Sequence, residues 1–549
     1  MSFTKKQINR NRSGAALIVS MIFVLIFSAL AVSMASLSGT NVQLSDNQHK
    51  VNLTFSAALS ALECGKYIIS NTPTVSTTEN TVTTSQADAT WNRLCANVQA
   101  QDWVNNQATV TADEIVTPTV NFGQPNTSFQ IKFYRSDTHT IALEGVGYAA
   151  DAGTVTNLDN GAQYSGISRR AGINLNIKKQ SEVLEYAVAS KSRIIITGDS
   201  TVEGNMYSTW DKPDTETPYS VSSASKINGS LNTVTDKSKF DPGDDDYVGY
   251  TLETLDENGD PMFDEEGNRI YSPGDMVQGQ HEGINYDEPI MPMSGFSASD
   301  YDTSSYKDQT TEISESDTTV QEYFPHEPGD YSTRSGWDSK RLDRHVYENE
   351  TFTNVRLPKD TNALFKNCTF EGVTFVECDE NTGWRSKGNN VRFDDCAFNG
   401  TIVSDVPDDL EWKDNVLYFT GSATFNNEYM EEATILAPNF NVNIGNTQVL
   451  EEGSESVLTG LIVGGIVDVR GNANIDGTIL SMFDPSDLLA SGSYGTNIGF
   501  SDENNEAGIP EDIGTIHIHP NPGRLLPSGI TTPIVIEAVK GTYSEMACL

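Results

Sequence analysis

The chain has 549 residues, of which 37% are hydrophobic and 20% charged, a composition typical of folded proteins. This length predicts two to four folded units rather than one. Acidic residues outnumber basic ones by 76 to 35, which gives a net charge of −41 at pH 7. Because such a polyanion repels nucleic acids and anionic lipid headgroups, neither is expected as a partner.

The first fourteen residues, MSFTKKQINRNRSG, are basic and polar. An apolar run without any charge follows from Ala15 to about Leu37, and it is long enough to cross a bilayer as a helix. The basic flank should stay in the cytoplasm, which places everything after the run on the other side of the membrane.

Apolar residues continue at helical spacing beyond the run, and they are Leu44, Val51, Phe55, Ala58 and Leu62. This periodicity predicts one helix over residues 15–70. A generic, uncleaved signal anchor has the same pattern, so the alternative of a structural envelope protein with one membrane span stays open.

The sequence Arg12-Ser13-Gly14, followed by Ala15-Ala16-Leu17-Ile18-Val19-Ser20, resembles the start of the PilX-type minor pilins of type IV pilus systems. The resemblance implies that residues 1–14 are a prepilin leader, that prepilin peptidase cuts between Gly14 and Ala15, and that the new N-terminus is methylated. It also implies that the helix is first a membrane anchor and later part of a filament core. Major pilins usually carry Glu four residues beyond the mature N-terminus, where this chain has Val19. A minor subunit is therefore expected rather than the bulk filament subunit.

Six cysteines are present, and none belongs to a C-x-x-C pair, which argues against a zinc site and thioredoxin-type redox chemistry. Cys64 and Cys95 flank a polar stretch, and we expect a disulfide between them if the chain enters an oxidising compartment.

Residues 71–187 are predicted to form a pilin-like α+β domain. Residues 71–90 are expected to be a loop, and a short helix is expected around Trp91–Cys95. The segments Ser128–Tyr134 and Ile141–Tyr148 alternate apolar and polar residues on either side of a short polar turn, which predicts a hairpin, and Arg170–Ile177 is a third strand.

Internal repeats indicate a parallel, right-handed β-helix over residues 188–540. Gly198–Ser208 matches Gly471–Ser481 closely in residue type, and Ile227–Leu231 is a shorter echo. Short strands with tight glycine corners and stacked like residues are typical of a solenoid.

A second repeat places Phe365, Phe370 and Phe375 five residues apart, and Phe393, Phe398 and Val403 repeat this spacing 28 residues later. The sequence predicts that these side chains fill the coil and that Cys368, Cys378 and Cys396 are buried ladder residues. Cys396 could bond Cys368 if the two stack on adjacent coils, whereas no partner for Cys548 is indicated.

Residues 209–350 are rich in acidic and hydroxyl residues, which predicts long loops or an insertion projecting from the solenoid. Within them Asp256, Asn258, Asp260 and Asp264 surround glycines in a way that suits a calcium loop, although two β-turns explain the pattern equally well. Calcium is thus the one cofactor candidate, and no other cofactor is expected.

His517 and His519 alternate along a strand, which predicts a solvent-facing pair rather than a zinc site, since no third ligand is evident. An enzyme acting on polysaccharide is the competing function, with Lys359, Arg385 and Arg392 as candidate bases, but no linear catalytic motif supports it.

The sequence therefore predicts a non-enzymatic minor pilin-like subunit of the inner membrane, with its C-terminal part in the periplasm and later at the pilus or cell surface. The resemblance implies prepilin peptidase and other pilins as partners. The acidic β-helix is expected to serve adhesion, through a glycan or another cell-surface ligand, or pilus assembly.

Overall fold

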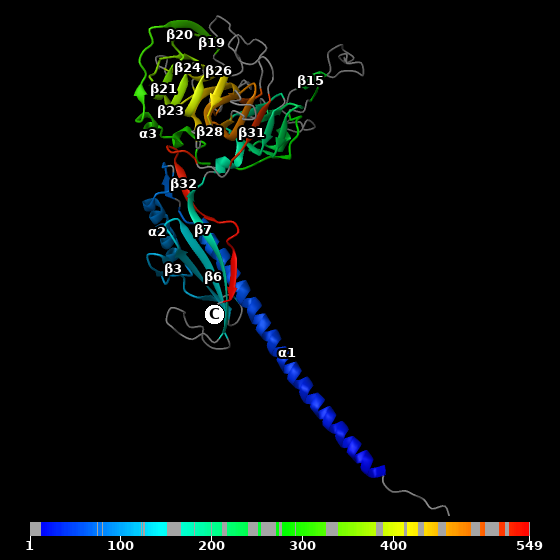
Figure 1. Cartoon of the computed structure of the whole chain (residues 1–549). Coiled ribbons are helices and arrows are strands. Elements are labelled where there is room, and N and C mark those ends of the chain that lie inside the picture. The colour runs from blue at the N-terminus through cyan, green and yellow to red at the C-terminus, as the bar shows by residue number, and fades with distance from the viewer. Residues whose placement is uncertain are drawn as a thin grey trace, which may run out of the picture. The chain divides into compact units, whose positions relative to one another are not determined.

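The computed structural model describes residues 12–547 apart from internal gaps (Figure 1). Outside the described residues lie 1–11, 74, 80, 122, 124–126, 151–165, 181, 199, 211–216, 240–250, 254–270, 274–276, 291–292, 326–338, 380–387, 411–413, 427–432, 448–456, 485–494, 500–514, 522–525 and 548–549. The chain divides into two units, and each is described by itself. Unit 1 comprises residues 1–74, 84–178 and 535–549, and unit 2 comprises residues 75–83 and 179–534.

Unit 1 is built on one long helix, α1 (Arg12–Ser70), as the apolar periodicity predicts. The helix ends where Asn71 donates its N–H to the Tyr67 carbonyl, and Pro73 then prevents any continuation. A second helix, α2 (Thr84–Ala100), includes the short helix predicted around Trp91–Cys95. It also includes residues 84–90, so the loop predicted for that stretch is wrong there, because Ala87 and Trp91 give the segment a buried apolar face.

An antiparallel sheet covers the C-terminal half of α1. The hairpin of β5 (Thr127–Arg135) and β6 (Thr140–Ala150) is confirmed, and β7 (Gly166–Lys179), which contains the predicted third strand, pairs with β6. Three short strands extend the β5 side of the sheet: β2 (Thr109–Val110), β3 (Glu114–Val116) and β4 (Val120–Asn121).

The C-terminal strands return to this unit. After β32 (Thr532–Ala538), whose first residues pair with β1 (Val75–Thr77) in unit 2, β33 (Ser544–Ala547) pairs with residues Arg169–Gly172 of β7. The last described strand, β33, therefore belongs to the antiparallel sheet of unit 1. The solenoid is inserted in the chain between β7 and the end of β32, because residues from 535 onward belong to unit 1.

Unit 2 is a parallel β-helix, which confirms the predicted fold class of an apolar helix on an antiparallel sheet followed by a parallel solenoid. Its strands share one parallel pairing pattern and are β8 (Tyr186–Ser190), β9 (Arg193–Ile196), β10 (Thr201–Glu203), β11 (Asn205–Ser208), β12 (Tyr219–Val221), β13 (Lys226–Asn228), β14 (Ser230–Thr233), β17 (Gly283–Asn285), β18 (Thr311–Glu312), β20 (Ser339–Glu348), β21 (Thr351–Leu357), β22 (Leu364–Lys366), β23 (Thr369–Val376), β24 (Asn389–Asp394), β25 (Ala397–Ser404), β26 (Asn415–Phe425), β27 (Ala433–Thr447), β28 (Val457–Val469), β29 (Ala473–Ser481), β30 (Gly495–Ile498) and β31 (Ile516–His519). Two antiparallel pairings accompany them, β19 (Thr319–Pro325) with β20 and β15 (Thr251–Glu253) with β16 (Tyr271–Pro273). Part of the acidic segment predicted as an insertion thus forms solenoid strands, namely β12, β13, β14, β17, β18 and β20.

The coils do not stack in chain order. The coil of β29, β30 and β31 pairs with β8, β9 and β10, which in turn pair with β11, β12 and β13. The chain therefore enters the solenoid in the middle, builds one end, and crosses to the other end at β18 and β20 before it returns. This order explains the predicted repeats, because Val202 stacks between Ile518 and Ile227, and Ile518 stacks on Ile475.

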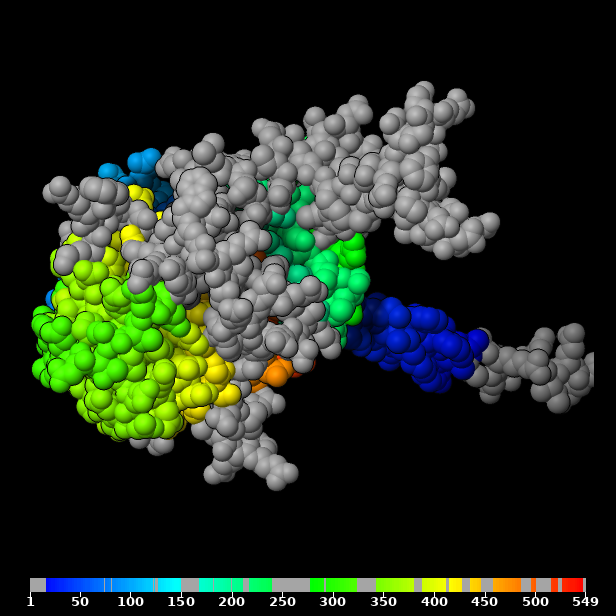
Figure 2. Space-filling view, turned by 90° about the horizontal axis from the view of Figure 1, so that it is seen from above, coloured from blue at the N-terminus to red at the C-terminus, as the bar shows by residue number. Residues whose placement is uncertain are grey.

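The interior of the solenoid is filled by stacked phenylalanines, as predicted. Phe365, Phe393 and Phe419 form one column with ring centroids 5.4 and 5.2 Å apart. The coils that carry them form a continuous rounded surface, coloured green to yellow in Figure 2.

Phe375 and Val403 lie outside the coil, contrary to the prediction that they fill it. They pack with Phe296 and Tyr301 of the crossing segment, and Lys307 in α3 (Ser304–Lys307) places its Nζ 5.5 Å from the centre of the Phe375 ring. The crossing segment thus makes a second apolar layer on one outer face, which a five-residue spacing does not reveal.

Candidate membrane and assembly helix

The N-terminal half of α1 is wholly exposed, and it is apolar to about Leu37. Every side chain from residue 16 to residue 49 is exposed, and an 18-residue window of this helix has a mean hydropathy of 2.7 with none of it buried. The exposed members include Leu17, Phe23, Leu25 and Phe27. A continuous apolar surface of this length requires a membrane or other apolar helices around it.

Two hydroxyl groups on this half donate hydrogen bonds within the helix. Ser20 Oγ donates to the Leu17 carbonyl at 2.8 Å, and Thr40 Oγ1 donates to the Ser36 carbonyl at 2.9 Å. In hydrocarbon a hydroxyl must find its partner inside the protein, so the Ser20 bond removes the cost of burying that hydroxyl.

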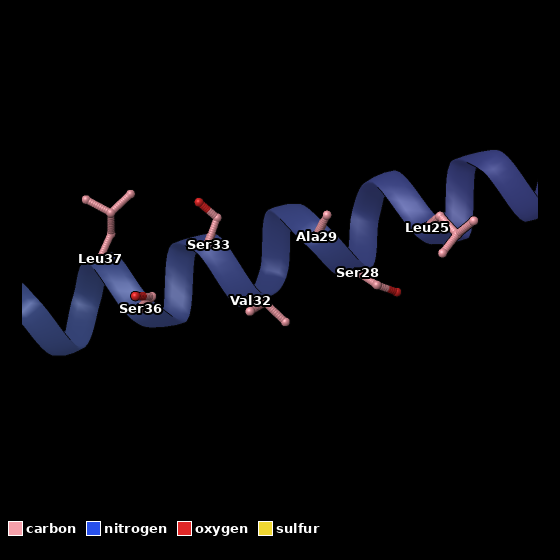
Figure 3. Close-up of a pocket in the computed structure, with 7 residues that line it drawn as sticks. All are labelled: Leu25, Ser28, Ala29, Val32, Ser33, Ser36 and Leu37. Atoms are coloured by element: carbon pink, nitrogen blue, oxygen red, sulfur yellow. The ribbon is translucent and has the colours of Figure 1, made fainter.

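Small side chains make a shallow groove along the same half. Figure 3 shows the lining residues along three turns of the helix: Leu25, Ser28, Ala29, Val32, Ser33, Ser36 and Leu37. Serine and alanine let a neighbouring helix approach closely, which is how helices associate in a bilayer.

The C-terminal half of α1 has the opposite environment. Ala57, Ala58, Ala61 and Leu62 are buried beneath β5 and β6. Contact is close enough to require glycine, since a Cβ atom at Gly147 would lie 1.9 Å from the Thr54 carbonyl oxygen. A Cβ atom at Gly145 would lie 2.2 Å from the Ala58 carbonyl oxygen. The backbone of β6 therefore rests directly on the helix backbone.

The predicted processing positions lie at the start of the helix. Gly14 and Ala15 are in the first turn of α1, and their side chains are outside the described residues. Val19, which stands where major pilins have Glu, is 50% exposed. Cleavage after Gly14 stays a prediction.

Cys64 on α1 and Cys95 on α2 are both half-buried thiols in the structure. Burial raises the pKa of Cys64, and it raises the pKa of Cys95 to about 11. The two helices pack together, and Asn97 Nδ2 on α2 donates to the Ile68 carbonyl of α1 at 2.9 Å. The disulfide is not formed in this structure, and the pairing stays a prediction for the oxidised protein.

Two of the three basic residues considered for catalysis on the solenoid are held in ion pairs. Lys359 pairs with Asp379, and Arg392 pairs with Glu322, whereas Arg385 lies outside the described residues. Glu322 also pairs with Arg344, which is fully buried and whose pKa burial lowers to about 10. No sequence signal pointed to this cluster, because its members come from β19, β20 and β24.

The metal candidates gain no support. Asp256, Asn258, Asp260 and Asp264 lie outside the described residues. His517 and His519 both face outward with ring centroids 6.3 Å apart while Ile518 between them is buried, as a solvent-facing pair requires. Within the described part of the chain no three His, Cys, Asp or Glu side chains could share a metal ion.

Comparison with known proteins adds little to this picture. No protein-family model matches the sequence, and no curated protein does. Among solved structures the chain is similar to the competence-associated pilin ComZ from Thermus thermophilus, at 11% identity and a TM-score of 0.28, over 90% of this chain and 97% of that one. A TM-score of this size carries no argument about fold or function, so the functional case depends on the chain's own residues.

Proposed function

We propose that this protein is a minor pilin-like subunit, processed by prepilin peptidase after Gly14 and carrying its acidic solenoid to the cell surface for adhesion or pilus assembly. The observation that carries the proposal is the division of α1 into an exposed apolar half and a packed half. A helix that is anchored in its own domain at one end and bare at the other is suited first to a membrane and then to a bundle of like helices.

The dimensions fit this use. The apolar run from Ala15 to Leu37 spans about 34 Å as a helix, enough for the hydrocarbon core of a bilayer. The polar residues 38–49 are also exposed and add about 18 Å of helix before the packed half begins. The basic leader keeps the N-terminus in the cytoplasm, so both units face the periplasm while the helix waits in the inner membrane.

The solenoid argues for a specialised subunit. It accounts for most of unit 2, residues 179–534, and is inserted in the chain between two strands of unit 1. A module of this size is difficult to repeat along a tight filament, which favours low abundance or a place at the tip. Its partners would be other pilins, the filament machinery and a glycan or protein on another surface.

The test is the N-terminal sequence and intact mass of the protein isolated from its native cell envelope. The proposal predicts a chain that begins at Ala15 with a methylated amine, and a Gly14→Val variant that keeps its leader. A wild-type chain that still begins at Met1 or Ser2 contradicts the proposal and leaves an uncleaved, membrane-tethered solenoid.

Enzymatic action on polysaccharide is not part of the proposal. The full chain in detergent is expected to release neither reducing ends nor unsaturated products from anionic or neutral polysaccharides. Product release that disappears in an Arg392→Gln variant would replace adhesion by catalysis as the role of the solenoid.

A further inference from the structure

Cys368 and Cys396 occupy the same corner of two consecutive coils. Their neighbours pair in register on both sides, Phe365 with Phe393 and Thr369 with Ala397. The Ala397 N–H donates to the Cys368 carbonyl at 2.9 Å, which ties the two corners together.

The two thiols are also oriented alike. Cys368 Sγ lies 3.3 Å from the carbonyl oxygen two residues before it, and Cys396 Sγ lies 3.4 Å from the equivalent oxygen. Each sulfur also approaches a carbonyl one coil away, that of Tyr347 at 3.5 Å for Cys368 and that of Phe365 at 3.6 Å for Cys396. Both side chains therefore point into the coil and stack.

Stacking at this spacing is within the range of a disulfide. Neighbouring strands lie about 4.8 Å apart. The Cα atoms of bonded cysteines are usually about 4.4 to 6.8 Å apart, and their Cβ atoms about 3.8 Å. Each cysteine lies between two strands rather than within one, directly after a residue in the left-handed region, Asn367 at φ 50° or Asp395 at φ 53°. The backbone at these corners can therefore shift slightly to bring the two sulfur atoms to bonding distance.

We propose that Cys368 and Cys396 form a disulfide that joins two consecutive coils of the solenoid. The Cys368 thiolate attacks a sulfur of a disulfide oxidant, such as oxidised glutathione or a disulfide oxidoreductase, and expels one thiolate. Cys396 then loses its proton and attacks the sulfur of Cys368 in this mixed disulfide, which releases the second thiol. Two cysteine thiols are oxidised and one oxidant disulfide is reduced to two thiols.

The electrostatics of the pair agree with these roles. Contact with the Cys396 thiol, acting against burial, lowers the pKa of Cys368, which favours its thiolate as the attacking group. The same contact, together with burial, raises the pKa of Cys396. Both sulfurs are buried in the finished coil, so the exchange belongs to the time when the coil of β24 and β25 docks.

The third solenoid cysteine is not a competing partner in the stack. Val376 pairs with Ser404, so the position equivalent to Cys378 on the next coil is Val406. Burial raises the pKa of Cys378, which keeps it a thiol. Cys378 is therefore a matched control, buried in the same core without a stacked cysteine.

The experiment is a disulfide map of the full chain, isolated from its envelope with a thiol-blocking maleimide present and digested with trypsin and a Glu-specific protease. Cleavage after Lys366, Glu371, Glu377 and Arg392 separates Cys368, Cys378 and Cys396 onto different peptides. The proposal predicts that the peptide from Asn367 is joined to the peptide from Phe393 and that a reductant separates them. Recovery of both peptides as maleimide adducts, or joined to other cysteines, overturns it.

Variants check the assignment independently of the map. Cys368→Ala and Cys396→Ala should each free one thiol for the maleimide, whereas Cys378→Ala should leave the joined peptides unchanged. The bond needs the oxidising compartment that the proposed export supplies, and the same digest reports the N-terminus. A chain that begins at Ala15 with both thiols free overturns the disulfide alone, and a joined pair in a chain that keeps its leader overturns the processing alone.

Discussion

The two halves of α1 have the same secondary structure and opposite surroundings. Residues 16–49 are exposed throughout, with large apolar side chains such as Phe23 and Leu30 on the surface. The packed half has alanines at Ala57, Ala58 and Ala61, and the strand above it has glycines. The glycines of β6 separate the two halves, because Gly145 and Gly147 let that strand rest on the backbone of the packed half, whereas residues 16–49 are exposed.

This contrast means that a substitution in one half should impair only the property that depends on that half, either the folding of unit 1 or membrane insertion. A change that forces β6 away from the helix should unfold unit 1 and leave the apolar half able to enter a membrane. A charge in the apolar half should impair membrane insertion and leave unit 1 folded.

The largest effect is expected for Gly147→Ala in β6. The added methyl group would lie 1.9 Å from the Thr54 carbonyl oxygen and 2.7 Å from the Ala58 amide nitrogen, so helix and sheet must separate. Overpacking against a backbone should cost about 3 kcal/mol or more in the free energy of unfolding. Urea denaturation of the full chain in detergent, followed by hydrogen exchange of the α2 peptides measured by mass spectrometry, measures it.

Gly172→Ala is the matched control for this prediction. It lies in the neighbouring strand β7, where the nearest atoms to an added Cβ are 3.4 Å away, an ordinary contact. Its unfolding midpoint should remain close to that of the wild type. Equal stability of the two variants would mean that the helix does not lie directly on β6.

The next effect is expected for Phe27→Arg, which tests the exposed half. Phe27 is 65% exposed and lies near the middle of the apolar run. Arginine at the centre of a membrane helix costs about 2.5 to 3.5 kcal/mol in insertion, so the ratio of inserted to uninserted protein should fall by about a hundredfold. The urea midpoint of unit 1 should not change.

Membrane flotation of cell extracts measures this second prediction, and Val42→Arg is its control. Val42 is 66% exposed but lies beyond the apolar run, so its replacement should leave the membrane fraction intact. Loss of membrane association in both variants, or in neither, would remove the distinction between the apolar and polar parts of the exposed half.

Sequence reasoning succeeded where the determining contacts are local or repeated. The helix, the hairpin around Arg135 and the stacked phenylalanines follow from spacing alone. Three features depended on contacts between distant segments and were not predictable. The return of β33 to β7 joins residues about 375 apart, the Phe375 face is covered by a crossing segment, and the first coils stack on the last. None of these contacts leaves a periodic pattern in the sequence. The segments involved have ordinary strand or loop compositions, which do not indicate the distant segment that each one contacts.

The candidate membrane and assembly helix was likewise predictable only in part. The apolar run and its length were evident from the sequence, but the point at which exposure gives way to burial was not, since Leu44 and Leu62 continue one apolar stripe across it. The glycines of β6 fix that point, but glycine in a strand is equally typical of a bulge, a sharp bend or the close approach of a ligand.

The smallest effect is expected for Thr54→Val, which sharpens the boundary between the halves. Thr54 is fully buried, and its hydroxyl donates to the Val51 carbonyl at 2.8 Å. Valine has nearly the same shape as threonine but cannot donate this hydrogen bond. The Val51 carbonyl then loses a buried donor, so the free energy of unfolding should fall by about 1 kcal/mol. Thr40→Val removes the equivalent bond from the exposed half, where water or a neighbouring helix can replace it, and should not change the urea midpoint. A measurable loss at Thr40, or none at Thr54, would mean that the boundary lies elsewhere along α1.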